Sequence, residues 1–99
     1  GLIEPKAYGQ KECFEAGIKF ANAEGIIPAP EATHAVKGAI DVALECKKNG
    51  QTKTILFNLC GHGHFDMKAY ADYFSNSLSE DNYNEAEVNK ALEKLPKIA

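Results

Sequence analysis

Residues 55–66 read ILFNLCGHGHFD, and this stretch decides which fold we expect. It opens as a near-continuous apolar run and then breaks abruptly into alternating glycine and histidine. Such a run is typical of a central parallel strand that helices cover on both faces. In open α/β sheets, ligands lie just beyond the carboxyl ends of the strands. We therefore expect a strand over about 52–59 and a site in residues 60–64.

Helical periodicity surrounds the expected strand. Apolar residues recur three and four positions apart over about 10–23, 30–48, 66–74 and 84–95, which predicts two helices before the strand and two after it. Gly25 is typical of a left-handed C-cap, while Asp66 and Asn84 are placed to cap the third and fourth helices. The expected buried faces comprise Phe14, Ile18 and Ala21, then Val36, Ile40, Ala43 and Leu44, then Met67, Tyr70 and Phe74, and finally Val88, Ala91, Leu92 and Leu95.

The order of these elements predicts an α/β fold, helix-helix-strand-helix-helix, with one principal buried strand of the parallel type. We expect a single unit in which 1–9 is irregular, 10–78 forms the helix-helix-strand-helix part, and 79–99 is a connection with the C-terminal helix. A lone strand leaves backbone donors and acceptors unpaired, which is costly away from water. The strand should therefore pair with another copy, or the chain is a piece of something larger.

Composition argues against several classes of function. The 99 residues carry a net charge of −3, so nothing indicates a nucleic-acid surface. No apolar run approaches the roughly 20 residues that a membrane span requires. The three cysteines, Cys13, Cys46 and Cys60, are odd in number and follow no disulfide spacing. We interpret them as reduced thiols of a cytoplasmic protein.

Two separated motifs carry a resemblance to a known family. They read EGIIPAPEATHA at 24–35 and ILFNLCGHGHFD at 55–66, with further matches in FEAG at 14–17 and KLPK at 94–97. Together they resemble the C-terminal part of the tryptophan synthase beta chain, in the divergent, stand-alone branch that carries the Gly-His-Gly-His-Phe-Asp form. The resemblance covers essentially the whole chain. It implies a C-terminal fragment of a fold-type II enzyme that depends on pyridoxal 5'-phosphate.

By this resemblance, the intact enzyme is a cytoplasmic, homodimeric lyase of amino-acid biosynthesis that converts indole and L-serine to L-tryptophan and water. In the family, the lysine that binds the cofactor and the loops that hold its phosphate and the substrate lie far upstream. No lysine of this chain sits in a matching motif, so we expect these residues alone to be inactive and to bind no cofactor. The rest of the parent chain, or another copy, would complete the sheet.

The resemblance also implies roles for particular residues. Cys60 takes the place of a serine that faces the pyridine nitrogen of the cofactor, with Gly61 and His62 beside it. A neutral thiol there leaves this nitrogen largely unprotonated, whereas a carboxylate would hold a proton on it. Glu31 matches a catalytic glutamate that assists proton transfer, and Glu24 could have either a site role or a structural one. From the residues alone, Cys60 could also be a small buried residue at a strand end, and Glu31 a first-turn helix carboxylate.

Two other functions stay open at this point. The segment could be a non-catalytic structural or interaction module. It could also be a small metal-binding protein that uses Cys60, His62 and His64, because a His-x-His pair can chelate. Zinc sites usually have three or four ligands, and no fourth occurs here at a firm spacing, so we expect no metal site. The histidines would then line the mouth of the cofactor pocket or lie in solvent.

Overall fold

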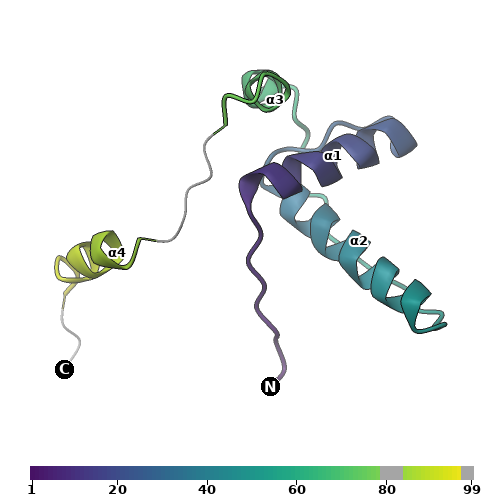
Figure 1. The fold of residues 1–99 in the computed structure, drawn as a ribbon, viewed down its shortest axis with the longest axis horizontal. Coiled ribbons are helices and arrows are strands. Elements are labelled where there is room, and N and C mark those ends of the chain that lie inside the picture. Colours follow the sequence, from purple (N-terminus) through teal and green to yellow (C-terminus); the bar gives the residue numbers. More distant parts are fainter. Residues whose placement is uncertain (79–83, 97–99) are drawn as a thin grey trace.

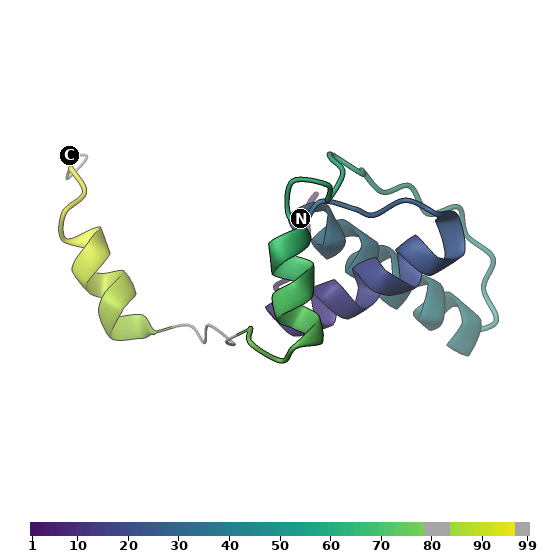
Figure 2. The same ribbon diagram turned by 90° about the horizontal axis from the view of Figure 1, so that it is seen from above.

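The computed structural model describes residues 1–78 and 84–96, and four helices account for most of this part (Figures 1 and 2). The helices are α1 (Gln10–Glu24), α2 (Ala32–Lys48), α3 (Met67–Phe74) and α4 (Glu85–Leu92). The prediction of four helices at these places in the chain is confirmed. The expected connection over residues 79–83 lies outside the described residues.

The helix ends follow local sequence signals at some positions and not at others. Gly25 ends α1 with φ of 72°, and its amide donates to the Ala21 carbonyl at 2.8 Å, so the predicted left-handed cap is confirmed. Asn84 caps α4, because its side chain accepts hydrogen bonds from the amides of Ala86 and Glu87. Asp66 precedes α3, but its side chain caps nothing, and that prediction is wrong. Its backbone, with φ −116° and ψ 22°, lacks the extended conformation that a capping side chain needs.

The expected strand over 52–59 does not form, and residues 1–78 and 84–96 contain no strand at all. The described part of the chain is therefore helical, with an extended segment from 51 to 61 running back from α2 toward α3, instead of α/β (Figure 1). A strand exists only where a neighbour pairs with its backbone, and the described residues supply none for this run. Leu56 is accordingly 96% exposed. The apolar pattern predicted a run that is covered on both faces, and the described residues do not supply that cover.

A small core lies where α1 meets α2 and α3. The Phe14 ring meets Tyr70 edge-on at 5.0 Å and stacks on Tyr73 at 5.7 Å. At Gly17, an ideal Cβ would come within 2.6 Å of Thr33 Cγ2, so α1 and α2 approach closely there. The apolar side chains and alanines buried in this core are Cys13, Phe14, Ala16, Ala29, Ala32, Val36, Cys46 and Tyr70.

Several faces that we expected to be buried are open. Leu44, Met67 and Phe74 are exposed, and so are the two leucines of the C-terminal stripe. Within the described residues, α4 packs against none of the other helices. The radius of gyration is 16.7 Å, against about 13 Å for a compact domain of this length. Periodicity identified faces that are able to be buried, but burial also needs a facing surface, and this part of the chain does not provide one.

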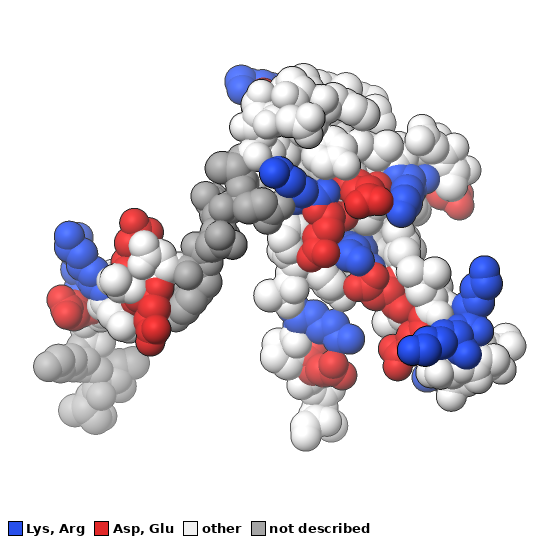
Figure 3. Space-filling view, viewed as in Figure 1, with Lys and Arg blue, Asp and Glu red and all other residues white. Residues whose placement is uncertain are grey.

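Charged side chains of both signs are interspersed over the face shown in Figure 3, without a large area of one sign. Three ion pairs join residues four apart on the helices, and pairs as exposed as these add little to stability. They are Glu15–Lys19, Lys37–Asp41 and Lys68–Asp72. In the part of the chain that the structure describes, no helix is long and apolar enough to cross a membrane.

The close approach of α1 and α2 can be tested at Gly17. Gly17→Ala should lower the free energy of unfolding by about 1–3 kcal/mol, because the new methyl group would overlap Thr33. Gly38→Ala is the matched control, since a Cβ there meets nothing closer than the Tyr8 hydroxyl at 3.7 Å. Helix propensity favours alanine by about 1 kcal/mol, so the control should be neutral or stabilising. Denaturant unfolding measures both, and a Gly17→Ala protein as stable as the parent would contradict the packing described here.

Candidate functional site

Two segments far apart in the sequence cross beside α1 and fix the loop of the Gly-His-Gly-His motif. The Ala29 amide donates to the Gly61 carbonyl at 2.9 Å, and the Gly63 amide donates to the Ile27 carbonyl at 2.8 Å. Between these bonds lies an antiparallel bridge that joins residues 28 and 62. We call this pairing of 27–29 with 61–63 the crossing. It brings the motif loop against the link between α1 and α2.

The two glycines of the crossing have different roles. An ideal Cβ on Gly63 would lie 2.6 Å from the Pro28 carbonyl oxygen and 2.8 Å from Ile27 Cγ2, so no side chain fits there. A Cβ on Gly61 would meet only the Ala29 Cβ, at an ordinary contact distance of 3.4 Å. Close approach of the two backbones therefore requires glycine at 63, while position 61 has room for a methyl group.

Hydroxyl groups from α2 and α3 donate hydrogen bonds to two carbonyls of the link. The buried hydroxyl of Tyr70 donates to the Pro28 carbonyl oxygen at 2.6 Å. The Thr33 hydroxyl donates to the Pro30 carbonyl. Burial raises the pKa of the Tyr70 hydroxyl, and the negative charge of Asp66 raises it further. The phenol therefore keeps its proton, and its role as a donor, throughout the neutral pH range.

Three of the four predicted site residues lie in or next to this crossing, and the fourth, Glu31, follows it closely in the sequence. Cys60 is exposed and directly precedes Gly61, and His62 is exposed at the bridge. Glu31 is also exposed, two residues beyond Ala29, at the start of α2. Its side chain does not cap the helix, so the structural alternative for this residue, a carboxylate serving the helix end, gains no hydrogen bond. Cys60 is exposed in this part of the chain, so the other structural alternative, a small buried residue, gains no support from the described residues.

The histidines form an aromatic cluster with each other and with Phe65. The rings of His62 and His64 lie 5.0 Å apart, and His62 Nδ1 accepts a hydrogen bond from the His64 amide at 3.2 Å. The Phe65 ring is 5.4 Å from that of His62. Within residues 1–78 and 84–96, no three His, Cys, Asp or Glu side chains gather closely enough to hold a metal ion. The metal-binding alternative therefore gains no support from this geometry.

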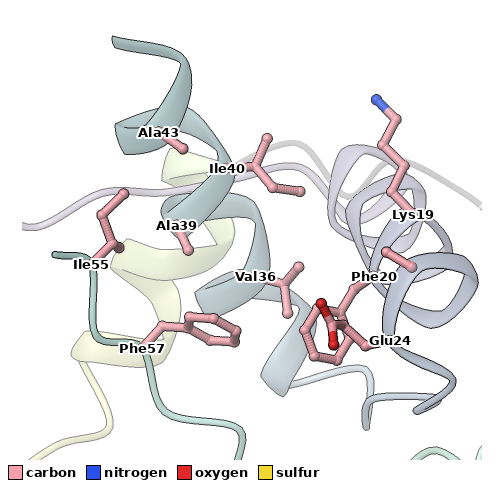
Figure 4. Close-up of a pocket in the computed structure, with 10 residues that line it drawn as sticks. Lys19, Phe20, Glu24, Val36, Ala39, Ile40, Ala43, Ile55 and Phe57 are labelled. Carbon is pink, nitrogen blue, oxygen red and sulfur yellow. The ribbon is translucent and has the colours of Figure 1, made fainter. Parts of the chain in front are cut away.

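A separate apolar groove of about 390 Å³ lies between α1, α2 and the extended segment (Figure 4). Phe20 and Phe57 meet edge-on across it, with ring centres 5.9 Å apart, and Val36 also lines it. Glu24 is one of the residues that line this groove, among mostly apolar side chains. A groove with one carboxylate and one lysine on an apolar surface lacks the convergent polar groups of a catalytic site.

Sequence reasoning missed the polar role of Tyr70. Its place in the stripe with Met67 and Phe74 predicted a core ring, and the ring is buried as expected. The hydroxyl gave a weak additional signal, because a buried tyrosine usually finds a hydrogen-bond partner. Which carbonyl accepts that bond depends on residues 42 positions away, beyond the reach of any local pattern.

Comparison with known proteins gives a consistent set of relatives, although no family model matches the chain. The chain is 60% identical over 78 residues to tryptophan synthase beta chain 2 of Methanosarcina mazei. It is 55% identical over 80 residues to tryptophan synthase beta chain 2 of Aquifex aeolicus, and 54% identical over 80 residues to the tryptophan synthase beta chain of Pyrococcus horikoshii. These matches cover 79–81% of this chain but only 17–18% of the relatives, in their C-terminal part.

The steric role of Gly63 leads to a prediction with a built-in control. Gly63→Ala should destabilise the protein by about 1–3 kcal/mol, since its methyl group would overlap the Pro28 carbonyl and force the crossing apart. Gly61→Ala, two residues away in the same loop, should cost less than about 1 kcal/mol because its neighbour is at van der Waals distance. Thermal and denaturant unfolding compare the two variants. Equal losses of stability in the two variants would mean that any side chain added to this loop is destabilising, and that the contact with Pro28 is not the cause.

The exposure of the cysteines predicts their reactivity. Cys60 should react rapidly with a disulfide reagent in the native protein, whereas the buried Cys13 and Cys46 should react only as the chain unfolds. A native titration should therefore show one fast thiol, and a titration in denaturant should show all three. Cys60→Ser should abolish the fast phase. A fast phase that survives this substitution would show that the core is open to solvent.

Proposed function

Because the chain is homologous to the C-terminal part of tryptophan synthase beta chains, as its two motifs predicted, we propose that it is a segment of an enzyme of this kind. The intact enzyme would depend on pyridoxal 5'-phosphate and form L-tryptophan and water from indole and L-serine. The observation that carries this proposal is an identity of 52–60% to such chains over about four fifths of the residues. The proposed activity belongs to the longer protein, because this chain spans less than a fifth of its relatives.

The residues at the crossing fit one wall of a cofactor pocket. Cys60 presents an exposed thiol, and Gly61 adds no side chain between that thiol and a flat ring. Two backbone hydrogen bonds fix the loop from behind, so the thiol has a defined position without being sealed in the core. When bound, pyridoxal phosphate supplies an electron sink for chemistry at the carbon atoms of an amino acid.

In this proposal Cys60 acts by staying neutral. A thiol is a weak hydrogen-bonding group, so it would contact the pyridine nitrogen without giving that nitrogen a full proton. His62 and Gly61 would complete the same edge of the pocket. The neutral contact would limit how strongly the ring withdraws electrons. In this way the protein would tune the reactivity of the cofactor.

Glu31 would be the catalytic residue that moves a proton during the loss of the serine hydroxyl. Its exposed carboxylate lies at the start of α2, next to the crossing, and is committed to no helix cap. A carboxylate in such a position can accept or donate a proton once a substrate and the remaining walls of the pocket surround it. The groups that would surround it belong to the parent chain.

The open apolar faces are consistent with a segment that needs the rest of its parent chain. Leu56, Phe65 and Phe74 are all exposed, and large exposed apolar areas on a protein usually mark a missing partner. We propose that the parent chain covers the extended segment and that the intact enzyme is a homodimer. The segment alone would then be inactive.

The proposal is tested first by activity and cofactor uptake. The intact protein should bind pyridoxal phosphate with a visible absorbance band and form tryptophan from serine and indole. The 99-residue chain alone should do neither. An intact protein that binds no pyridoxal phosphate would overturn the proposal and favour a non-catalytic module. An active isolated chain would overturn the assignment of the chemistry to the parent chain.

The role of Cys60 is tested by two substitutions in the intact protein. Cys60→Ser keeps a small neutral group and should retain most of the activity. Cys60→Asp places a carboxylate at the same point, which would hold a proton on the ring nitrogen, and should lose most of the activity. Steady-state rates of tryptophan formation, with cofactor content measured for each variant, make the comparison. Equal rates in the two variants would remove the proposed role.

A further inference from the structure

The hydroxyl of Tyr70 restrains the crossing from a third segment of the chain. Tyr70 is 5% exposed, and its hydroxyl donates to the Pro28 carbonyl oxygen at 2.6 Å. This bond ties α3 to the link between α1 and α2, across 42 positions of sequence. A phenylalanine would fill the same volume. The hydroxyl therefore adds a directional restraint on the backbone at Pro28, where the link pairs with the motif loop.

The ring of Tyr70 is held on several sides. An ideal Cβ on Gly17 would come within 3.2 Å of the hydroxyl oxygen, and one on Gly63 would come within 3.0 Å of Cε2. Phe14 meets the ring edge-on at 5.0 Å. The backbones of α1 and of the motif loop thus both approach the same ring. A ring enclosed in this way cannot move its hydroxyl oxygen away from Pro28 without displacing its neighbours.

Both segments of the crossing lead directly to a proposed site residue. From Pro28 and Ala29, the link continues to Glu31 at the start of α2. From the Gly61 carbonyl, which accepts the Ala29 amide, the loop leads back to the adjacent Cys60. No contact between the two site residues themselves is needed for their spacing to be fixed. The crossing joins the two segments that carry them, and the Tyr70 hydroxyl bonds to one of these segments at Pro28.

We propose that Tyr70 is a positioning residue of the intact enzyme, which holds Glu31 and Cys60 in register through its hydrogen bond to the Pro28 carbonyl. This inference rests on the function proposed above. Tyr70 touches neither the substrate nor the cofactor in this proposal, and it acts only through the backbone of the crossing. The competing explanation is a ring that merely fills the core, and then loss of the hydroxyl would leave the crossing and the site unchanged.

The test compares Tyr70→Phe with Tyr73→Phe in the intact protein. Tyr73 lies on the same helix and stacks on the same Phe14 ring, at 5.7 Å, so its variant also removes a phenol hydroxyl from α3. Amide hydrogen exchange at Ala29 and Gly63 reports directly on the two bonds of the crossing. Tyr70→Phe should speed exchange at these amides about tenfold, the effect of losing one buried hydrogen bond, whereas Tyr73→Phe should leave it unchanged.

A second readout separates positioning from simple stability. The visible absorbance band of bound pyridoxal phosphate should shift in Tyr70→Phe and stay in place in Tyr73→Phe, since only the first variant frees Cys60 to move. Faster exchange together with a shifted band supports the proposal. Unchanged exchange would overturn it, and so would faster exchange with an unshifted band, because the crossing would then not position the site.

The unmodified intact protein separates the two proposals. If it binds no pyridoxal phosphate, the proposed function fails, and the role of Tyr70 toward a cofactor site fails with it. If it binds the cofactor normally and the Tyr70→Phe variant keeps the same band, the function stands and only the positioning role is overturned.

Discussion

The antiparallel pairing of residues 27–29 with 61–63 is the constraint on which the rest of the described structure depends. Two backbone hydrogen bonds make the pairing, and each contributes only about 1 kcal/mol net. The residues packed around the pairing stabilise it further. Pro28 has no amide hydrogen to donate, its carbonyl is taken by Tyr70, and Gly63 leaves no space between the backbones. Two weak bonds are thus held in place by close packing, and together they connect three helices.

The same constraint links the fold to its proposed chemistry. Loops carry functional residues well only when rigid elements hold them, and the motif loop is held on one side by the link and on the other by α3. The residues that face outward from the crossing, Cys60, His62 and Glu31, are exposed, while the residues behind them are buried. One wall of a binding site needs this arrangement, in which a restrained backbone carries side chains that are exposed toward the ligand. The opposite walls would come from the longer protein.

The extended segment shows what happens to a strand sequence without a neighbour. Its apolar residues would be buried in a sheet, yet Leu56 is almost fully exposed, while Ile55 and Leu59 are half-buried and Phe57 contacts Phe20 edge-on. The C-terminal helix shows the same effect, because its leucine stripe faces no other described helix. Both features would be costly in an independent domain. They are consistent with a segment that evolved as part of a larger core.

The sequence by itself determined the helices, the left-handed cap at Gly25, the capping residue Asn84 and the kinship with tryptophan synthase beta chains, because periodicity, cap residues and motifs are local. The resemblance of its motifs also predicted that residues 60–62 and Glu31 belong to one site. Only the tertiary structure decided that no strand forms in the described residues, that Met67 and Phe74 stay exposed, and that the Tyr70 hydroxyl closes on Pro28. The physical reason is the same in each case. A strand, a buried face and a long-range hydrogen bond all need a partner, and a local pattern shows what a residue is able to bury or bond without showing what lies opposite.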